Sequence, residues 1–527
     1  MMKYMLKREA GRMEKIGIFP NLKEFEKEVS EQNLQIQTYG RRIRNSQTFY
    51  EYLIEFLLVF MGEKDGERGF KKIKDYNSKV KYKNNSNIAL KRFIFLDSSK
   101  KDNIYDIDVD ANLMLNESLL EKINAEGISA KECLEIIREL FIGFTAYSGD
   151  RGWFAKALLP LCEETIFPEA IGRMKDRKEA KKSGSGFIEY GKITLKVDKK
   201  FEFKAHNFLA RGGEVYFLHI LQGFLEIENL NGKESSENIK NEMETRLFEL
   251  INTLPEFKRL SKWIQNTWIN ILKKETGKEE EEIKEALRED LECQWISEYY
   301  KQRAPYTVKE LLNILRADIN EFEKFEVMSL GIIYQILRMM SEVATHIATE
   351  NLKKPIWIID VDNMSQNRKL KKIATDSYKK IEEHMIIAVS KMVRGEESKL
   401  LKNAYDDSHK LLRKLGKEIG FVVPIKGDNM RFSINDGIIK FLVLAVVEPQ
   451  KKMTLDTFLR NLNTQFGIVI GPREYEEYLY ERGIESDTSC FNYNLEAFQN
   501  LLRKNGFLKE LSDATSIVIN PYKNLEV

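Results

Sequence analysis

Two carboxylates close the apolar stretch PIWIIDVDNM, residues 355–364, and their type and spacing could serve metal chemistry. Asp360 and Asp362 follow a run of apolar residues, Ile356 to Ile359, that is typical of a buried strand. Carboxylate oxygens are hard ligands that match Mg²⁺ or Mn²⁺, and a metal-dependent hydrolase takes several of them from different elements. The same aspartates could instead be ordinary turn residues after a strand.

This strand and its carboxylates resemble the first strand of PIN- and NYN-like nucleases, where an acidic residue at the strand end holds a divalent ion. The resemblance implies a nuclease that binds Mg²⁺ or Mn²⁺ through Asp360 and Asp362. The aspartates that could complete such a site stand far away in the sequence: Asp108 and Asp110 in a second IDVD, and Asp406 and Asp407 in AYDDSHK. One strand end is not a site, so we expect a structural turn, no catalytic residue and no cofactor, with the nuclease as the alternative.

A second candidate is an anion site in HNFLARGGEVYFLHI, residues 206–220. If a helix begins near Glu214, Gly212 and Gly213 would offer backbone N–H groups at its positive end, and Arg211 would add charge. The alternative is that the glycines only turn the chain into the helix, with Arg211 and Glu214 paired. Because the phosphate-loop pattern GxxxxGK[ST] and the zinc motif HExxH are both missing, the structural alternative is favoured.

Other catalytic chemistries find little support in the sequence. The five histidines stand apart from one another without ligand spacing, and no GxSxG elbow accompanies Ser148. The four cysteines form no CxxC pair, so we expect reduced, mostly buried thiols.

The C-terminal region has the most specific pattern. Residues 435–447 predict an apolar helix or a buried strand, and the elements that follow favour the helix. TLDTFLRNLNTQFG predicts a second helix from the cap Thr454 to the stop Gly467. NLEAFQNLLRKNG predicts a third helix with Asn494 as its cap, and FLKELSDATSIVIN predicts two strands joined near Asp513. An additional helix is expected over residues 473–482.

This order of three helices and a hairpin resembles the winged-helix family over roughly the last 90 residues. In winged helices that bind DNA, the helix before the hairpin enters the major groove. The resemblance implies nucleic-acid contacts by Gln499, Asn500, Arg503 and Lys504, with Glu496 opposing them. Many winged helices dock proteins instead, so both partners stay open. Basic clusters at residues 41–44, 173–182 and 368–372 could add phosphate contacts or could be ordinary solvated surface.

Elsewhere the pattern predicts a mainly α chain with small β elements, which is an α+β fold class. We expect a helical scaffold of several domains. We expect an N-terminal helical domain over residues 1–182, a middle domain over 183–404 that opens with a small β-hairpin (187–204) and continues as helices, and a winged-helix-like domain over 405–527. Capping boxes are predicted at Ser129 with Glu132 and at Thr307 with Glu310. Residues 63–90 are expected to form a loop, and KEEEEIKEALREDLE a surface helix.

Length and charge limit the function further. A chain of 527 residues exceeds what one core supports, and 84 Lys and Arg against 82 Asp and Glu exclude a globally basic coat for nucleic acid. Apolar runs are shorter than a membrane span and the N-terminus lacks a signal-peptide core, so we expect a cytoplasmic protein without membrane contact.

Taken whole, the Lys-, Glu-, Asn- and Ile-rich chain resembles uncharacterised accessory proteins encoded beside ATPases in bacterial phage-defence islands. The resemblance implies a non-enzymatic component of a bacterial multi-protein complex that binds DNA or a partner. Anti-phage defence is the role that this resemblance suggests for the complex. The resemblance also implies other protein subunits as partners, an ATPase among them. Because no nucleotide motif is visible, any ATP chemistry would come from another chain.

Overall fold

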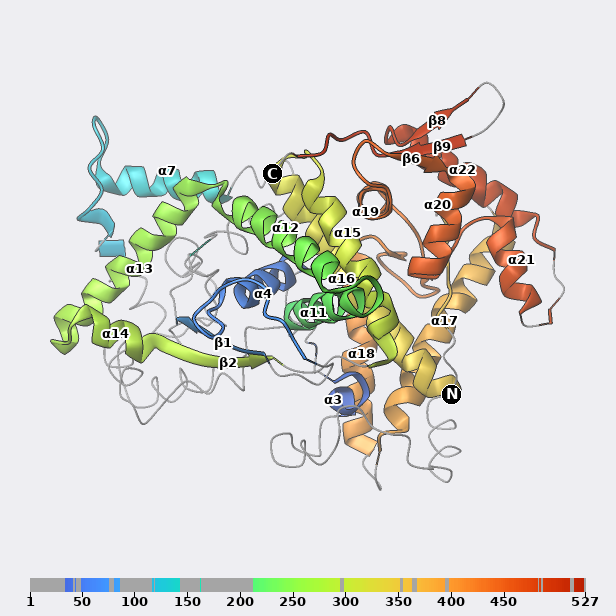
Figure 1. Ribbon diagram of the computed structural model, residues 1–527, viewed down its shortest axis with the longest axis horizontal. Coiled ribbons are helices and arrows are strands. Elements are labelled where there is room, and N and C mark those ends of the chain that lie inside the picture. Colours follow the sequence, from blue (N-terminus) through green and yellow to red (C-terminus); the bar gives the residue numbers. More distant parts are fainter. Residues whose placement is uncertain are drawn as a thin grey trace.

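The computed structural model describes residues 34–40, 43, 49–74, 80–85, 116, 117, 119–142, 162, 212–293, 298–350, 354–362, 367–393, 398–481, 483, 484, 487–511 and 516–525. Within these residues the protein is mainly helical with a few small sheets, which confirms the expected fold class (Figure 1). The hairpin predicted at 187–204 and the Asp108–Asp110 repeat lie outside the described residues.

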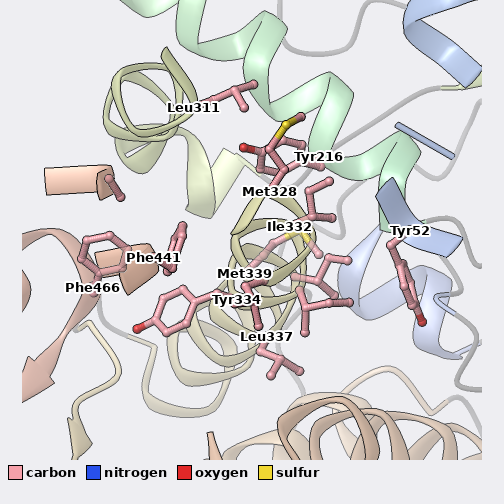
Figure 2. Close-up of a cluster of buried hydrophobic side chains, with 14 of the residues drawn as sticks. Tyr52, Tyr216, Leu311, Met328, Ile332, Tyr334, Leu337, Met339, Phe441 and Phe466 are labelled. Atoms are coloured by element: carbon pink, nitrogen blue, oxygen red, sulfur yellow. The ribbon is translucent and has the colours of Figure 1, made fainter. Parts of the chain in front are cut away.

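The centre of the fold is the long helix α16, Glu321–Thr349. It packs against α4 (Phe49–Met61), α11 (Gly212–Asn231), α17 (Arg368–Ser390) and α19 (Asp436–Val446). Side chains such as Met328, Tyr334 and Met339 lie in the resulting core, which Figure 2 shows. By length and composition α16 could cross a membrane, but 94% of its most apolar window is buried inside the protein.

Further helices complete the body around this core. They are α3 (Leu34–Tyr39), α12 (Lys233–Asn252), the 3₁₀ helix η5 (Glu298–Arg303), α15 (Ala304–Arg316) and α18 (Ser398–Glu418). Helices α7 (Ala130–Ile142), α13 (Pro255–Thr276) and α14 (Glu280–Leu287) lie at one end of the molecule (Figure 1). The predicted capping box at the start of α7 is confirmed, because the Ser129 N–H donates to Glu132 and the Glu132 N–H donates to the Ser129 hydroxyl.

Three local predictions in the body are wrong. Pro305 lies in the first turn of α15, where a missing N–H costs nothing. Thr307 is therefore inside the helix and does not cap it with Glu310. The charged helix predicted from residue 278 ends at Leu287, and the chain continues as β2 (Arg288–Cys293), which pairs antiparallel with β1 (Val80–Asn85). The expected loop 63–90 thus contains a strand.

The apolar stretch before Asp360 is a strand, as predicted. β3 (Trp357–Ile358) pairs in parallel with β7 (Ile468–Val469), and Ile359 bridges to Phe432 on β5 (Arg431–Phe432). β5 pairs in turn with β4 (Val422–Val423). Trp357 is fully buried and its ring stacks on that of Phe432. This contact holds β3 against β5.

The C-terminal module, residues 436–519, contains α19, β6 (Lys452–Thr454), α20 (Leu455–Asn461), a π-helical turn (Leu462–Phe466), α21 (Pro472–Tyr480), α22 (Cys490–Lys504), β8 (Leu508–Glu510) and β9 (Ser516–Ile519). Strands β6, β8 and β9 form an antiparallel sheet in the order β6-β9-β8. Thr454 caps α20 through its hydroxyl, and Gly467 ends the π-helical turn at φ 69°, as predicted. The additional helix expected at 473–482 is α21.

One start point in the module is wrong. The third helix begins at Cys490, four residues before the predicted cap. Asn494 is fully buried inside α22, where its amide donates to the Ile359 and Ile470 carbonyls and accepts from the Val361 N–H. The expected boundary at residue 405 falls inside α18, and the one at 182 lies outside the described residues.

Candidate nucleic-acid interface

The outward face of α22 carries the residues that the winged-helix resemblance singled out. Asn500, Arg503 and Lys504 are exposed, and Gln499 is half-buried. The face is polar because α22 buries the opposite stripe, which includes Phe491, Phe498 and Leu502. The helix therefore presents three of the four predicted side chains fully to solvent.

Both cations on this face already have acidic partners in the chain. Arg503 forms an ion pair with Glu510 on β8 and donates to the Asn500 side chain. The Lys504 ammonium lies 3.3 Å from the carboxylate of Asp436 at the start of α19. A hydrogen bond from the Asn505 side chain, and secondly the Lys504 ammonium, hold the pKa of Asp436 below its usual range. Exposed pairs contribute about 0–1 kcal/mol, so a phosphate could displace either carboxylate.

The β-sheet of the module offers charge without such partners. Lys452 on β6 and Lys509 on β8 are exposed, and neither forms an ion pair within the described residues. The register pairs Lys452 with Ile519 and Lys509 with Ile517 across β9, so both lysines stand on the same face of the sheet. The sheet beside α22 therefore presents two exposed lysines on one face.

Asp360 is held by an arginine. Its carboxylate is fully buried and accepts from the Arg431 guanidinium, Nε to Oδ2, at 2.6 Å. Burial raises the pKa of Asp360, and the Arg431 contact opposes that rise. Asp362 accepts a hydrogen bond of 2.7 Å from the Tyr493 hydroxyl. The two aspartates thus fasten β3 to β5 and to α22.

A metal would need further ligands beside these two. No group of three or more His, Cys, Asp or Glu side chains suited to a metal occurs among the described residues. Asp406 and Asp407 lie on α18, where Asp406 pairs with Lys410, and Asp108 and Asp110 lie outside the described residues. Nothing in the described geometry therefore builds an Mg²⁺ or Mn²⁺ site around Asp360.

At the start of α11, where the sequence offered a candidate anion site, the backbone N–H group of Gly213 binds a carboxylate of the protein itself. The Gly213 N–H donates to the buried Glu55 carboxylate of α4 at 2.7 Å. A Cβ added at Gly213 would lie 2.4 Å from the Tyr52 carbonyl oxygen, so glycine is needed for the close approach of α4 and α11. At Gly212 it would meet the Tyr52 ring. Arg211 lies outside the described residues. This geometry favours the structural interpretation of the two glycines.

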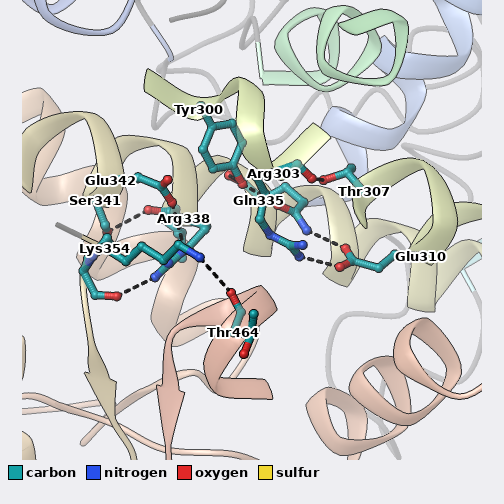
Figure 3. Close-up of polar contacts among 12 residues, drawn as sticks. Tyr300, Arg303, Thr307, Glu310, Gln335, Arg338, Ser341, Glu342, Lys354 and Thr464 are labelled. Carbon is teal, nitrogen blue, oxygen red and sulfur yellow. Dashed lines mark hydrogen bonds and ion pairs between the residues drawn. The ribbon is translucent and has the colours of Figure 1, made fainter. Parts of the chain in front are cut away.

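Sequence reasoning missed a buried polar network next to the module, which Figure 3 shows. Arg303 pairs with Glu310, and the Gln335 amide donates to the same carboxylate at 2.7 Å. The Tyr300 hydroxyl donates to Gln335, and Arg303 lies over the Phe466 ring of the π-helical turn. The spacing of Arg303 and Glu310, seven residues apart on one helical face, was the available signal. These contacts join η5, α15 and α16 and fix how the module's π-helical turn sits on the body.

The described fold defines a class: a helical scaffold that carries a C-terminal module of helices and a three-stranded antiparallel sheet. Residues 276–521, a little under half of the chain, match the model of a family described as "Methylation-associated defense system protein MAD7". The match supports the predicted resemblance to accessory proteins of phage defence, and a role in a methylation-associated defence system. No curated protein and no solved structure matches the chain.

Proposed function

We propose that this protein is a non-catalytic component of a methylation-associated defence system and that its C-terminal module is a winged-helix-like contact for DNA. The observation that carries the proposal is the order of the module's elements. A helix, strand, helix, helix and hairpin (α19, β6, α20, α22, β8 and β9), with the sheet order β6-β9-β8, match the plan of a winged helix. α21 is an insertion in that plan.

The surface of α22 supports DNA as the partner. Asn500 and Gln499 have amides that can pair with base edges, and Arg503 can reach a phosphate or a guanine. Glu496 and Glu510 lie on or beside the same face and oppose phosphates. We therefore expect modest affinity for duplex DNA that falls steeply with salt, because each phosphate contact releases counterions.

The test is a binding titration of the full chain with labelled duplex and single-stranded DNA, in Mn²⁺ or EDTA and at two salt concentrations. We expect a salt-sensitive complex without cleavage. Arg503→Ala should weaken binding and lower the slope of log K against log salt by about 0.9, the value for one lost phosphate contact.

Arg259→Ala is the matched control. Arg259 is an exposed arginine in an ion pair with Glu256 on α13, so the variant loses the same charge and the same kind of contact far from the module. Equal effects of the two substitutions would contradict a DNA contact at α22. If wild-type protein does not bind DNA at low salt, the module is a docking site for another protein subunit, such as the expected ATPase. Metal-dependent cleavage would contradict the non-catalytic assignment.

A further inference from the structure

The first turns of α17 carry a basic patch, which consists of Arg368, Lys369, Lys371 and Lys372. Lys369 is 2.6 Å from the carboxylate of Asp487, and Lys371 is half-buried. Arg368 and Lys372 are exposed and form no ion pair within the described part of the chain. The patch therefore has two cations available to an external anion, whereas Arg503 and Lys504 on α22 are paired.

The fold places this α17 basic patch beside α22. Leu370 of α17 packs in one small core with Tyr475 of α21 and Phe491 of α22. The Lys369–Asp487 pair joins α17 to the turn just before α22, and α17 reaches the α21 and α22 region in Figure 1. The segment between β3 and α17 is tied to α22 by the Tyr493–Asp362 hydrogen bond. The patch thus flanks the first half of α22 on the Tyr493 side.

The β8–β9 hairpin contacts the other end of the same helix. Arg503 pairs with Glu510 on β8, next to the exposed Lys509. The exposed face of α22 has helical spacing through Asn492, Glu496 and Asn500, and it runs from the basic patch toward the hairpin. Positive charge therefore stands near both ends of the helix that would enter a groove.

We propose that Arg368 and Lys372 bind the backbone phosphates of the DNA whose groove receives α22. The inference rests on the proposed function and extends the DNA contact from the module into the helical body. The major groove is about 12 Å wide and has a phosphate backbone along each edge, so a helix in the groove has phosphates on both sides. Contacts of this kind fix the position and orientation of a protein on the duplex without reading its sequence. Asp362 and Glu496, both near this surface, keep the contact weak.

The test compares the full chain with the double variant Arg368→Ala/Lys372→Ala in titrations with one duplex from 50 to 200 mM salt. Loss of two phosphate contacts should lower the salt slope by about 1.8, so that the wild type loses roughly tenfold more affinity than the variant over this range. Sequence preference should not change. Alanine retains helix propensity, and circular dichroism checks that α17 is intact.

Lys399→Ala/Lys402→Ala is the matched control. Both lysines are exposed on α18, which begins shortly after α17 ends. By helix rise, the C-terminal end of α17 is about 33 Å from Arg368 in the patch. The control should keep the wild-type slope. If the wild type binds duplex and both double variants keep its slope, the inference is overturned while the proposed function stands. If the wild type does not bind duplex, both are overturned.

Discussion

At the scale of single residues, Asp360 shows how a catalytic pattern can be structural. Asp360→Asn should lower the free energy of unfolding by roughly 2–4 kcal/mol, because the largely buried ion pair between Asp360 and Arg431 would be broken. Asp362→Asn, which alters an exposed hydrogen bond from Tyr493, should cost less than about 1 kcal/mol. Urea denaturation of the two variants measures the difference.

The nuclease hypothesis makes the opposite prediction for the same pair. A metal site at Asp360 would be strained by like charge, so Asn would leave stability unchanged or raise it in the absence of metal. Stability in EDTA and in Mn²⁺ therefore separates the two roles. A stable Asp360→Asn protein would contradict the ion pair as the main role of this carboxylate.

At the scale of elements, the packing of α11 on η5 buries a histidine. His219 stacks on Tyr300 with ring centroids 4.4 Å apart, and burial, together with Arg303, lowers the pKa of His219 to about 3. Unfolding returns it to about 6.5, so the unfolded chain binds one more proton between these values. The stability due to this packing is therefore complete above about pH 6.5 and is lost as pH falls.

The cost at pH 5 relative to pH 7 should be about 2 kcal/mol from His219. His219→Phe keeps a ring against Tyr300 but cannot take up a proton. Urea unfolding at both pH values should show that the variant loses about 2 kcal/mol less than the wild type on acidification. Buried Glu310 titrates in both proteins, so its contribution cancels. Parallel losses in the two proteins would show that His219 does not control the acid sensitivity.

At the scale of the whole molecule, the C-terminal segment ties the module to the helical body. The Asp318 N–H donates to the Lys523 carbonyl at 2.9 Å, and the Leu525 N–H donates to the Arg316 carbonyl at 2.8 Å. Arg246 of α12 donates to the Leu525 carbonyl, and the Lys440 ammonium lies over the Tyr522 ring. These contacts connect α12 and the turn between α15 and α16 to α19.

A variant that ends at Asn520 should therefore be less stable by about 2–4 kcal/mol, from several hydrogen bonds of about 1 kcal/mol each. Scanning calorimetry should show a lower melting temperature, with the module melting ahead of the body. Removal of Glu526 and Val527 alone keeps every one of these contacts and should leave the melting curve unchanged. Identical curves for the two truncations would show that the segment does not hold the module.

The sequence by itself determined the local elements. Helical spacing of apolar residues was enough to predict α21 and much of α22, because that pattern depends on residues three and four positions apart. The strand before Asp360, the hairpin of β8 and β9, and the caps at Thr454 and Gly467 follow from similarly short-range rules. The winged-helix plan itself stays a proposal.

Only the tertiary structure decided which polar groups meet. Gly213 donates a hydrogen bond to Glu55, 158 positions away in the sequence. Arg431 donates to Asp360 across 71 positions, and Val361 donates to Asn494 across 133. β1 and β2 pair across about 200 residues, which is why neither was predicted. A single sequence gives each group's hydrogen-bonding need but not its partner, because the partner is fixed by how helices pack. For this reason two apparent sites, at Asp360 and at Gly213, are occupied by the chain's own charges.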